Sequence, residues 1–460
     1  MCGIIGIYQK NLKLKTASKL AVLGLFAEQH RGQESCGIVY YDGTQLQLIK
    51  KMGLVKEVFH EDKLRDMRSH VAIGHVRYPT KGSSDIQNAQ PHVLNNLSGA
   101  QYALASNGDL VNYKELRSDL KKKNVLFESG NDGELILKYI VYKHEKDGLS
   151  IIDSIKSVMK SFKGSFSTVL LVKDEFYAFR DPHGNRPFIF GEIDDETYVF
   201  ASESCCIDIM KASFVKEVAP AEILHISNDG LTSYKLNPNE YRTQDKTAHC
   251  VFELIYFSRP DSVVYEHSVY SFRESLGKQL AKEETIIPDI VVPVPDSSNF
   301  IALGYAREMN VEFSLALIRN HYVGRTFIAP EQTIRDENVV QKFNPLPGYL
   351  EGKVVTLIDD SIVRGTTLQK IVKIVRSHGA KEVHVRIGSP MVKYPCFYGI
   401  DTPTYEELIA NQKKVEDIAK YLKADSLRYL EVEELKNLVK DKKNFCFACF
   451  DGNYPICLKE

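Results

Sequence analysis

The first half of the chain alternates short apolar runs with turn residues, and most runs have the length of a strand. Two longer segments, Ala17–His30 and Gly133–Lys143, carry apolar residues at helical spacing. The pattern predicts a layered α/β domain with much antiparallel pairing. The predicted strands are Gly3–Tyr8, Gly37–Tyr41, Ala72–Val76, Ser167–Val172, Phe176–Arg180 and Tyr198–Ser202.

In the second half, strands and helices alternate, which predicts a doubly wound parallel sheet. A polar stretch, Lys235–Lys246, separates this half from the first. We therefore predict one domain over residues 2–235 and another over residues 245–460. The predicted elements of the second half are strands at Ile287–Val294, Val354–Ile358 and Glu382–Ile387, with helices at Asn299–Met309 and Thr367–Ser377.

The composition is that of a large globular protein, with 43% hydrophobic and 26% charged residues in 460 positions. Because 59 basic residues nearly cancel 60 acidic ones, no overall field draws the chain to nucleic acid or to a membrane. No secretory signal pattern opens the chain, and the apolar run Ala21–Ala27 is too short to span a bilayer. We expect a cytosolic protein whose nine cysteines are catalytic, metal-binding or buried thiols.

A phosphate site is predicted in the string from Val354 to Thr367, which runs from a buried strand through a loop into a helix. Gly365 permits close backbone approach, and the helix N-terminus at Thr366 offers free amides and a favourable dipole. The adjacent carboxylates of Asp359 and Asp360 suit sugar hydroxyls or a divalent metal. The alternative is an acidic turn capped by a threonine.

Cys2 is the candidate nucleophile. It follows Met1 directly, so loss of Met1 would leave a thiol and a free α-amine on one residue. An α-amine has a reference pKa of about 7.7–8.0, so part of it is neutral at pH 7 and takes the thiol proton. The alternative is simply a small residue ahead of an apolar strand.

The second half resembles the type I phosphoribosyltransferases, whose signature the Val354–Thr367 string matches. Pro293–Ser298 resembles the family's pyrophosphate loop, and Arg319–Ile328 its mobile loop, where Arg325 would screen the leaving pyrophosphate. The resemblance implies that Asp359, Asp360 and Ser297 surround Mg²⁺ and the ribose. It also implies a phosphoribosyl pyrophosphate site built from Ser361, Val363, Arg364, Gly365, Thr366 and Thr367.

The first half resembles the glutamine amidotransferases of the N-terminal-nucleophile (Ntn) hydrolase class, because Cys2 and four short sequence strings match that class. Taken singly the strings are weak, since Asn107-Gly108 and Asp132-Gly133 are ordinary turn pairs. Together they match an acyl-transfer site that also holds the two charges of glutamine. The strings are His30–Glu34, Gly74–Thr80, Ser106–Asp109 and Asn131–Glu134.

This second resemblance implies an αββα sandwich and assigns a role to each motif residue. Cys2 would attack the glutamine amide, and the Asn107 amide with the Gly108 N–H would stabilise the oxyanion. Arg77 would bind the α-carboxylate and Asp132 the α-ammonium. Arg31, which would fix the local loop, and Thr80 complete the glutamine site.

Together the two halves resemble the glutamine phosphoribosylpyrophosphate amidotransferases, which open de novo purine synthesis. That family hydrolyses glutamine and passes ammonia through an internal channel to Mg-bound phosphoribosyl pyrophosphate, giving 5-phosphoribosylamine. The resemblance further implies a homotetramer and feedback inhibition by purine nucleotides.

Eight cysteines fall outside this chemistry, and we interpret four of them, Cys36, Cys205, Cys206 and Cys457, as ordinary thiols. The other four are Cys250, Cys396, Cys446 and Cys449. By residue type they suit zinc, an iron–sulfur cluster or plain buried thiols. The resemblance to the iron–sulfur branch of the family implies a 4Fe–4S cluster on these four. Members of that branch often carry a short propeptide, whereas here Cys2 directly follows Met1, so we expect that only Met1 must be removed. Asp296 and Ser297 stand where some relatives have Glu and Thr.

Three alternatives explain less of the chain. Another amidotransferase, making glucosamine phosphate or asparagine, would not need the Asp359–Thr367 string. A ligand-sensing regulator would leave Cys2 and its companions without a role, and the chain lacks a basic DNA-binding segment. A redox sensor would use the four cysteines alone.

Overall fold

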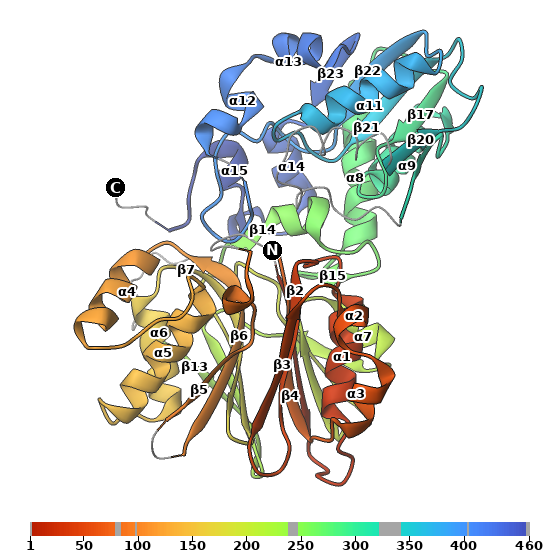
Figure 1. The fold of residues 1–460 in the computed structure, drawn as a ribbon. Coiled ribbons are helices and arrows are strands. Elements are labelled where there is room, and N and C mark those ends of the chain that lie inside the picture. Colours follow the sequence, from red (N-terminus) through yellow and green to blue (C-terminus); the bar gives the residue numbers. More distant parts are fainter. Residues whose placement is uncertain are drawn as a thin grey trace.

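Two lobes, one from each half of the chain, meet end to end (Figure 1). The structure, a computed structural model, describes residues 2–78, 84–96, 99–237, 247–321, 342–402 and 404–456. None of the described helices combines the length and the apolar composition that crossing a bilayer requires.

The N-terminal lobe contains two face-to-face antiparallel sheets in the described residues, which confirms the predicted sandwich. Their strand orders are β11-β9-β10-β1-β4-β2-β3 and β13-β12-β8-β7-β6-β5. The first comprises β1 (Gly3–Gln9), β2 (Ser35–Tyr41), β3 (Leu46–Met52), β4 (Val71–Arg77), β9 (Ile189–Ile193), β10 (Thr197–Ala201) and β11 (Ser213–Glu217). The second comprises β5 (His92–Asn95), β6 (Gln101–Leu110), β7 (Gly164–Val172), β8 (Glu175–Arg180), β12 (Glu222–Ser227) and β13 (Gly230–Lys235).

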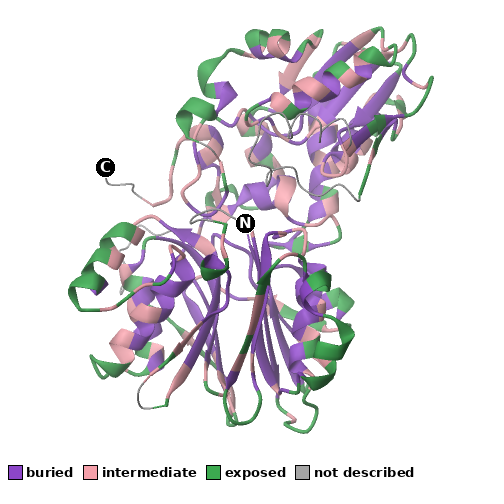
Figure 2. Ribbon diagram, in the orientation of Figure 1, coloured by how far each residue is buried: buried purple, intermediate pink, exposed green. Residues whose placement is uncertain are grey.

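Alternation along the strands separates the layers of this lobe. On β1, Ile4 and Tyr8 pack between the sheets, whereas Ile5 and Ile7 pack against the helices outside. Figure 2 shows the buried strands between helices whose outer faces are exposed. The helices are α1 (Ala17–Ala27), α2 (Val55–Val58), α3 (Glu61–Asp66) and α7 (Ser204–Ile209) beside the first sheet, and α4 (Tyr113–Lys122), α5 (Asp132–Glu145) and α6 (Ile151–Ser161) beside the second.

The C-terminal lobe is built on a parallel sheet of order β18-β17-β21-β22-β23, which confirms the doubly wound prediction. Helices α8 (Val269–Ala281) and α9 (Asn299–Met309) cover one face, and α11 (Thr366–Ser377) and α13 (Val415–Leu422) the other. The strands are β17 (Ile290–Pro293), β18 (Glu312–Phe313), β21 (Val354–Asp359), β22 (Glu382–Ile387) and β23 (Ser426–Tyr429).

Short elements complete the second lobe and its junction with the first. The parallel pair β14 (His249–Cys250) and β24 (Phe445–Cys446) ties the start of the lobe to its end. A π-helical turn at Glu253–Phe257 follows at the junction. The others are β15 (Val263–Val264), β16 (His267–Ser268), β19 (Leu317–Arg319), β20 (Phe343–Pro345), α12 (Ile409–Gln412), α14 (Val432–Leu438), α15 (Ala448–Asp451) and 3₁₀ turns at Tyr405–Glu407 and Lys442–Asn444, with one at Ile86–Asn88 in the first lobe.

One predicted strand was too short, since β7 begins at Gly164 and not at Ser167, and two predicted elements were too long. The helix predicted to reach His30 ends at Ala27, because the chain turns there and brings His30 to within 2.8 Å of the Glu203 carboxylate. The strand predicted from Ile287 begins at Ile290, and Ile287 itself is 79% exposed. In both cases a hydrophobic or helix-compatible residue continues the pattern beyond the element.

Candidate active site

A cavity in the N-terminal lobe, beside the ends of β4 and β6, collects most of the residues expected to handle glutamine. Cys2, Arg77, Gly108 and Asp132 line it, together with Ser165 and other residues. These residues come from four separate stretches of the sequence, and the sandwich fold brings them to one place.

Asn107 is hydrogen-bonded to Cys2 but is not itself among the residues that line this cavity. The Cys2 backbone N–H donates to Asn107 Oδ1 at 3.2 Å, and the Cys2 thiol lies 3.7 Å from the carbonyl oxygen of Tyr78. Asn107 is 1% exposed, and its Nδ2 donates to no other described residue. A buried donor without an acceptor is costly, so this amide is ready to donate to a ligand oxygen beside the thiol.

Gly108 is a glycine because β6 and β7 pack too closely for a side chain there. A Cβ at this position would lie 1.9 Å from the carbonyl oxygen of Ser165. The Asn107-Gly108 pair therefore lies within β6, although its residue types are typical of a turn.

The two charges expected to bind glutamine lie on the same cavity. Arg77, 2% exposed, forms an ion pair with Glu34. Asp132 begins α5, and its Oδ2 accepts the Leu110 N–H at 2.7 Å. Asn131 caps that helix by accepting the Gly133 N–H at 2.8 Å. The arrangement presents a cation and an anion to one small ligand.

Arg31 does not line the cavity but binds the backbone of Cys2, which does. Its Nε donates to the Cys2 carbonyl oxygen at 2.9 Å. Its guanidinium also pairs with the buried carboxylates of Glu203 and Glu253, in the latter case at 2.8 Å between Nη2 and Oε1. Although burial lowers it, these two carboxylates hold the pKa of Arg31 well above its usual range. Thr80 lies outside the described residues.

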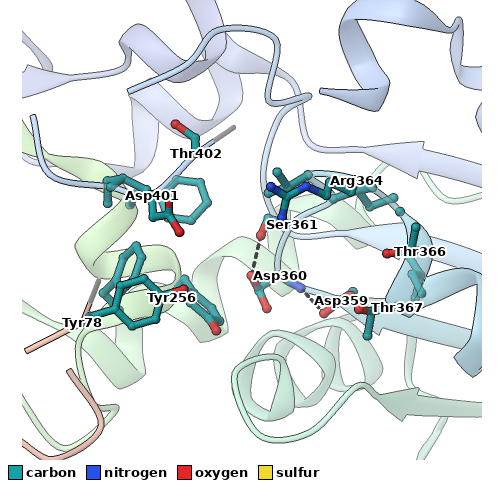
Figure 3. Close-up of a pocket in the computed structure, with 17 residues that line it drawn as sticks. Tyr78, Tyr256, Asp359, Asp360, Ser361, Arg364, Thr366, Thr367, Asp401 and Thr402 are labelled. Carbon is teal, nitrogen blue, oxygen red and sulfur yellow. Dashed lines mark hydrogen bonds between the residues drawn. The ribbon is translucent and has the colours of Figure 1, made fainter. Parts of the chain in front are cut away.

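A larger pocket in the C-terminal lobe contains the predicted phosphate string (Figure 3). Gly365 caps α11 with φ +77°, a conformation that favours glycine. Ser361, Val363, Arg364, Thr366 and Thr367 line the same pocket. The N-terminal amides of α11 are thus turned toward a cavity with hydroxyl groups around it, which suits a phosphate.

The paired carboxylates lie at the edge of this pocket. Ser297 donates to Asp360 Oδ2 at 2.6 Å, and Ser298 to Asp359 Oδ1 at 3.1 Å. Burial, reinforced by the charge of Asp360, raises the pKa of Asp359 well above its usual range. A cation or sugar hydroxyls would relieve this repulsion.

Arg364, which lines the pocket, pairs with Glu407, with 2.7 Å between Nε and Oε2. Arg325, the other predicted cation of this site, lies outside the described residues.

The four remaining cysteines of interest line one cavity at the junction of the lobes, with Arg186 and Tyr398. The register of β14 and β24 places Cys250 opposite Cys446. All four thiols are free, and burial raises the pKa of each. Arg186, fully buried, lowers the pKa of the Cys250 and Cys396 thiols and thereby offsets part of that rise.

In the described ranges no three His, Cys, Asp or Glu side chains are grouped closely enough to hold a single metal ion. A four-iron cluster spreads its ligands over four irons and therefore needs thiols that stand farther apart. The soft thiol donors and the buried cation fit such a cluster. At Asp359 and Asp360, oxygen donors from two carboxylates fit Mg²⁺, which takes its other ligands from substrate phosphates and water.

The glutamine cavity and the phosphate pocket share a wall. Tyr78 lines both. The segment after Cys396 also crosses between them, because the Tyr398 carbonyl accepts from Ser165 Oγ at 2.7 Å and Ile400 lines the phosphate pocket.

Sequence reasoning missed the buried acids of the junction, Glu203 and Glu253. Each is fully buried, and each binds Arg31. The local signal was a lone Glu in an apolar stretch, at Glu253. Arg31, the partner of both acids, lies 172 residues from Glu203 and 222 residues from Glu253.

Comparison with known proteins agrees with the geometry of both lobes. The glutamine amidotransferase domain family matches residues 79–208, and the phosphoribosyl transferase domain family matches residues 275–387. The chain is 45% identical to amidophosphoribosyltransferase 2, chloroplastic, of Arabidopsis thaliana, over 99% of this chain and 79% of that protein. It is 43% identical to the amidophosphoribosyltransferase of Methanothermobacter thermautotrophicus, over 99% of this chain and 95% of that one.

The fold is also that of a solved structure, the glutamine phosphoribosylpyrophosphate amidotransferase from B. subtilis complexed with ADP and GMP. The TM-score is 0.90 at 40% identity, covering 100% of this chain and 98% of that one.

Proposed function

The chain belongs to the amidophosphoribosyltransferase family, and from this premise we propose how its residues divide the reaction. The protein is a transferase with glutaminase activity, which uses glutamine to aminate phosphoribosyl pyrophosphate in purine biosynthesis. Glutamate, pyrophosphate and 5-phosphoribosylamine are the products.

In the first half-reaction the Cys2 thiol attacks the side-chain amide of glutamine. After loss of Met1, the α-amine of Cys2 takes the thiol proton and passes it to the departing ammonia. The Asn107 amide, with the Gly108 N–H, stabilises the oxyanion. Arg77 binds the α-carboxylate and Asp132 the α-ammonium, while Arg31 keeps the Cys2 carbonyl in place. Water then releases glutamate from the thioester.

In the second half-reaction the loop from Ser361 to Thr367 holds the 5′-phosphate, and Asp359 and Asp360 bind the ribose hydroxyls. Asp359, Asp360 and Ser297 would hold Mg²⁺ with the help of substrate oxygens. Bound Mg²⁺ would neutralise charge on the leaving pyrophosphate. Ammonia displaces that pyrophosphate at C1.

The observation that carries this proposal is the wall that the two cavities share. Tyr78 touches the space beside the thiol and the space beside the phosphate loop. We propose that ammonia released at Cys2 passes from the first of these neighbouring cavities to the second, since a passage that excludes water would keep it from being protonated and lost.

We propose four further properties. Cys250, Cys396, Cys446 and Cys449 hold a 4Fe–4S cluster, which the shared cavity and the buried Arg186 support. Purine nucleotides inhibit the enzyme, a proposal supported by the ADP and GMP in the B. subtilis relative. By family resemblance the protein is a homotetramer and works in the cytosol.

The test is pyrophosphate release by anaerobically purified protein supplied with glutamine, phosphoribosyl pyrophosphate and Mg²⁺, each omitted in turn. We expect release only when all three are present, and about four irons and four sulfides per chain. Folded, metal-replete protein that releases no pyrophosphate with either glutamine or ammonia would refute the proposal.

A further inference from the structure

A third carboxylate, Asp401, lies on the wall of the phosphate pocket that faces the N-terminal lobe. Figure 3 places it beside Tyr78 and Tyr256, across the cavity from Ser361 and Asp360. The two halves of the pocket therefore differ, because one wall binds sugar and phosphate and the other faces the source of ammonia.

The segment that precedes Asp401 is held in place by contacts with the N-terminal lobe and by a hydrogen bond within its own loop. The Tyr398 carbonyl accepts from Ser165 of the glutamine cavity at 2.7 Å. At Gly399, with φ +104°, a Cβ would lie 3.4 Å from the carbonyl carbon of Gly108. The Cys396 N–H donates to Thr402 Oγ1 at 2.6 Å, which closes the loop around Asp401. Asp401 is thus held between the two sites.

The transfer chemistry leaves one proton to be removed. As the nitrogen of ammonia bonds to C1, the C1–O bond breaks and its electron pair leaves with pyrophosphate. The nitrogen then has four bonds and a positive charge, and it must lose one proton to give the neutral amine. Asp359 and Asp360 are already occupied on the ribose side by Ser298, Ser297 and Ser361.

We infer that Asp401 is the base of the transfer step: its carboxylate accepts an N–H bond from the incoming ammonia and then takes the proton that the new ammonium releases. Water in the open pocket later removes that proton. This inference rests on the proposed function. Three charged groups act on Asp401: the N-terminal amino group of the chain, and Arg364 and Glu407, which also bind each other. Burial raises the pKa of Asp401; the Glu407 charge adds to this rise, whereas the N-terminal amino group and Arg364 oppose it.

The experiment compares Asp401→Asn and Asp401→Glu with the native protein, and uses Glu406→Gln as the control. Glu406 is an exposed acid in the same stretch that does not line the pocket. Pyrophosphate release is measured with saturating ammonia and, separately, with glutamine while glutamate is counted.

For Asp401→Asn we expect kcat with ammonia to fall about 10²-fold, the low end for loss of a general base, with the KM for phosphoribosyl pyrophosphate nearly unchanged. Glutamine hydrolysis should continue, so glutamate exceeds pyrophosphate. Asp401→Glu should recover part of the loss, and Glu406→Gln should behave as the native protein.

An Asp401→Asn rate within about threefold of the native rate would overturn the inference, since a general base contributes far more. If Asp401→Asn loses both activities, Asp401→Glu decides: recovery of transfer supports the inference, and no recovery overturns it as a structural effect. Native protein that makes no pyrophosphate from ammonia would instead refute the proposed function, and the inference with it.

Discussion

Replacing Asn107 by alanine tests the glutaminase site most directly. The Asn107 side chain is buried, and its Oδ1 accepts the Cys2 N–H while Nδ2 donates to no other described residue. The substitution removes the donor that we assign to the oxyanion. Arg77 and Asp132, to which we assign the rest of the glutamine molecule, stay in place.

The size of the effect follows from that geometry. One of two oxyanion donors is lost, and the remaining donor is the Gly108 N–H. Loss of one such donor lowers kcat about 10²–10³-fold, or about 2.7–4 kcal/mol of transition-state stabilisation. We expect this fall in glutamine hydrolysis, with KM for glutamine little changed. Ammonia-dependent synthesis should stay at the native rate, because Asn107 lies outside the phosphate pocket.

The assay measures glutamate and pyrophosphate on one preparation, with glutamine or with ammonia as the nitrogen source. Asn112→Ala is the control, since the Asn112 side chain is also hydrogen-bonded, to the Ser161 carbonyl and from the Lys163 N–H, but its partners do not include Cys2. That variant should lose some stability and keep both activities. Glutamine hydrolysis within about tenfold of native in folded Asn107→Ala would contradict the oxyanion assignment.

Three further predictions concern other parts of the molecule. Cys2→Ala should abolish glutamine-dependent synthesis and leave ammonia-dependent synthesis largely intact; loss of both from a folded protein would count against separable sites. Burial and Arg77 lower the pKa of His75 to about 3, so the unfolded chain binds an additional proton below about pH 6.5 and this part of the stability is lost as pH falls. Between pH 7 and pH 5 the loss is about 2 kcal/mol, and urea unfolding of His75→Gln should show a correspondingly smaller pH dependence. Cys449→Ser should lower the iron and sulfide bound per chain in anaerobic preparations, whereas Cys36→Ser, whose thiol lies in the core of the first lobe, should leave both unchanged.

The elements of this fold could be predicted because their hydrophobic periods are local. The helix Thr366–Ser377 shows this well: Leu368, Ile371, Val372 and Val375 form its buried face, and Gly379 ends it with φ +89°. Each of these facts depends on neighbours within a few turns of chain.

Asn107-Gly108 shows where local reading fails. Its residue types favour a turn, but the structure places the pair inside β6. Gly108 is required by the Ser165 carbonyl of β7, which would lie 1.9 Å from a side-chain carbon. That contact comes from a strand more than fifty residues later, so only the match of several motifs together could identify the pair as part of a site.

The junction of the lobes could not be predicted for the same reason. Arg31 is surrounded by Glu203 and Glu253, and all three are fully buried. A buried cation needs carboxylates close by, because its desolvation is costly. Glu28, three residues earlier, also acts on Arg31 through its charge, but the two carboxylates that bind Arg31 come from distant segments. The sequence therefore showed that Arg31 needs partners but did not identify these two.

These long-range contacts bear on why both reactions belong to one chain. Arg31 holds the carbonyl of Cys2, and one of its two carboxylate partners, Glu253, belongs to the second lobe. Ser165 of the glutamine cavity binds the backbone of Tyr398, also from the second lobe. The first lobe alone would therefore lack part of what positions its nucleophile and its cavity wall. The glutamine site is complete only when the lobe that consumes ammonia is docked, which places the release of ammonia next to its use.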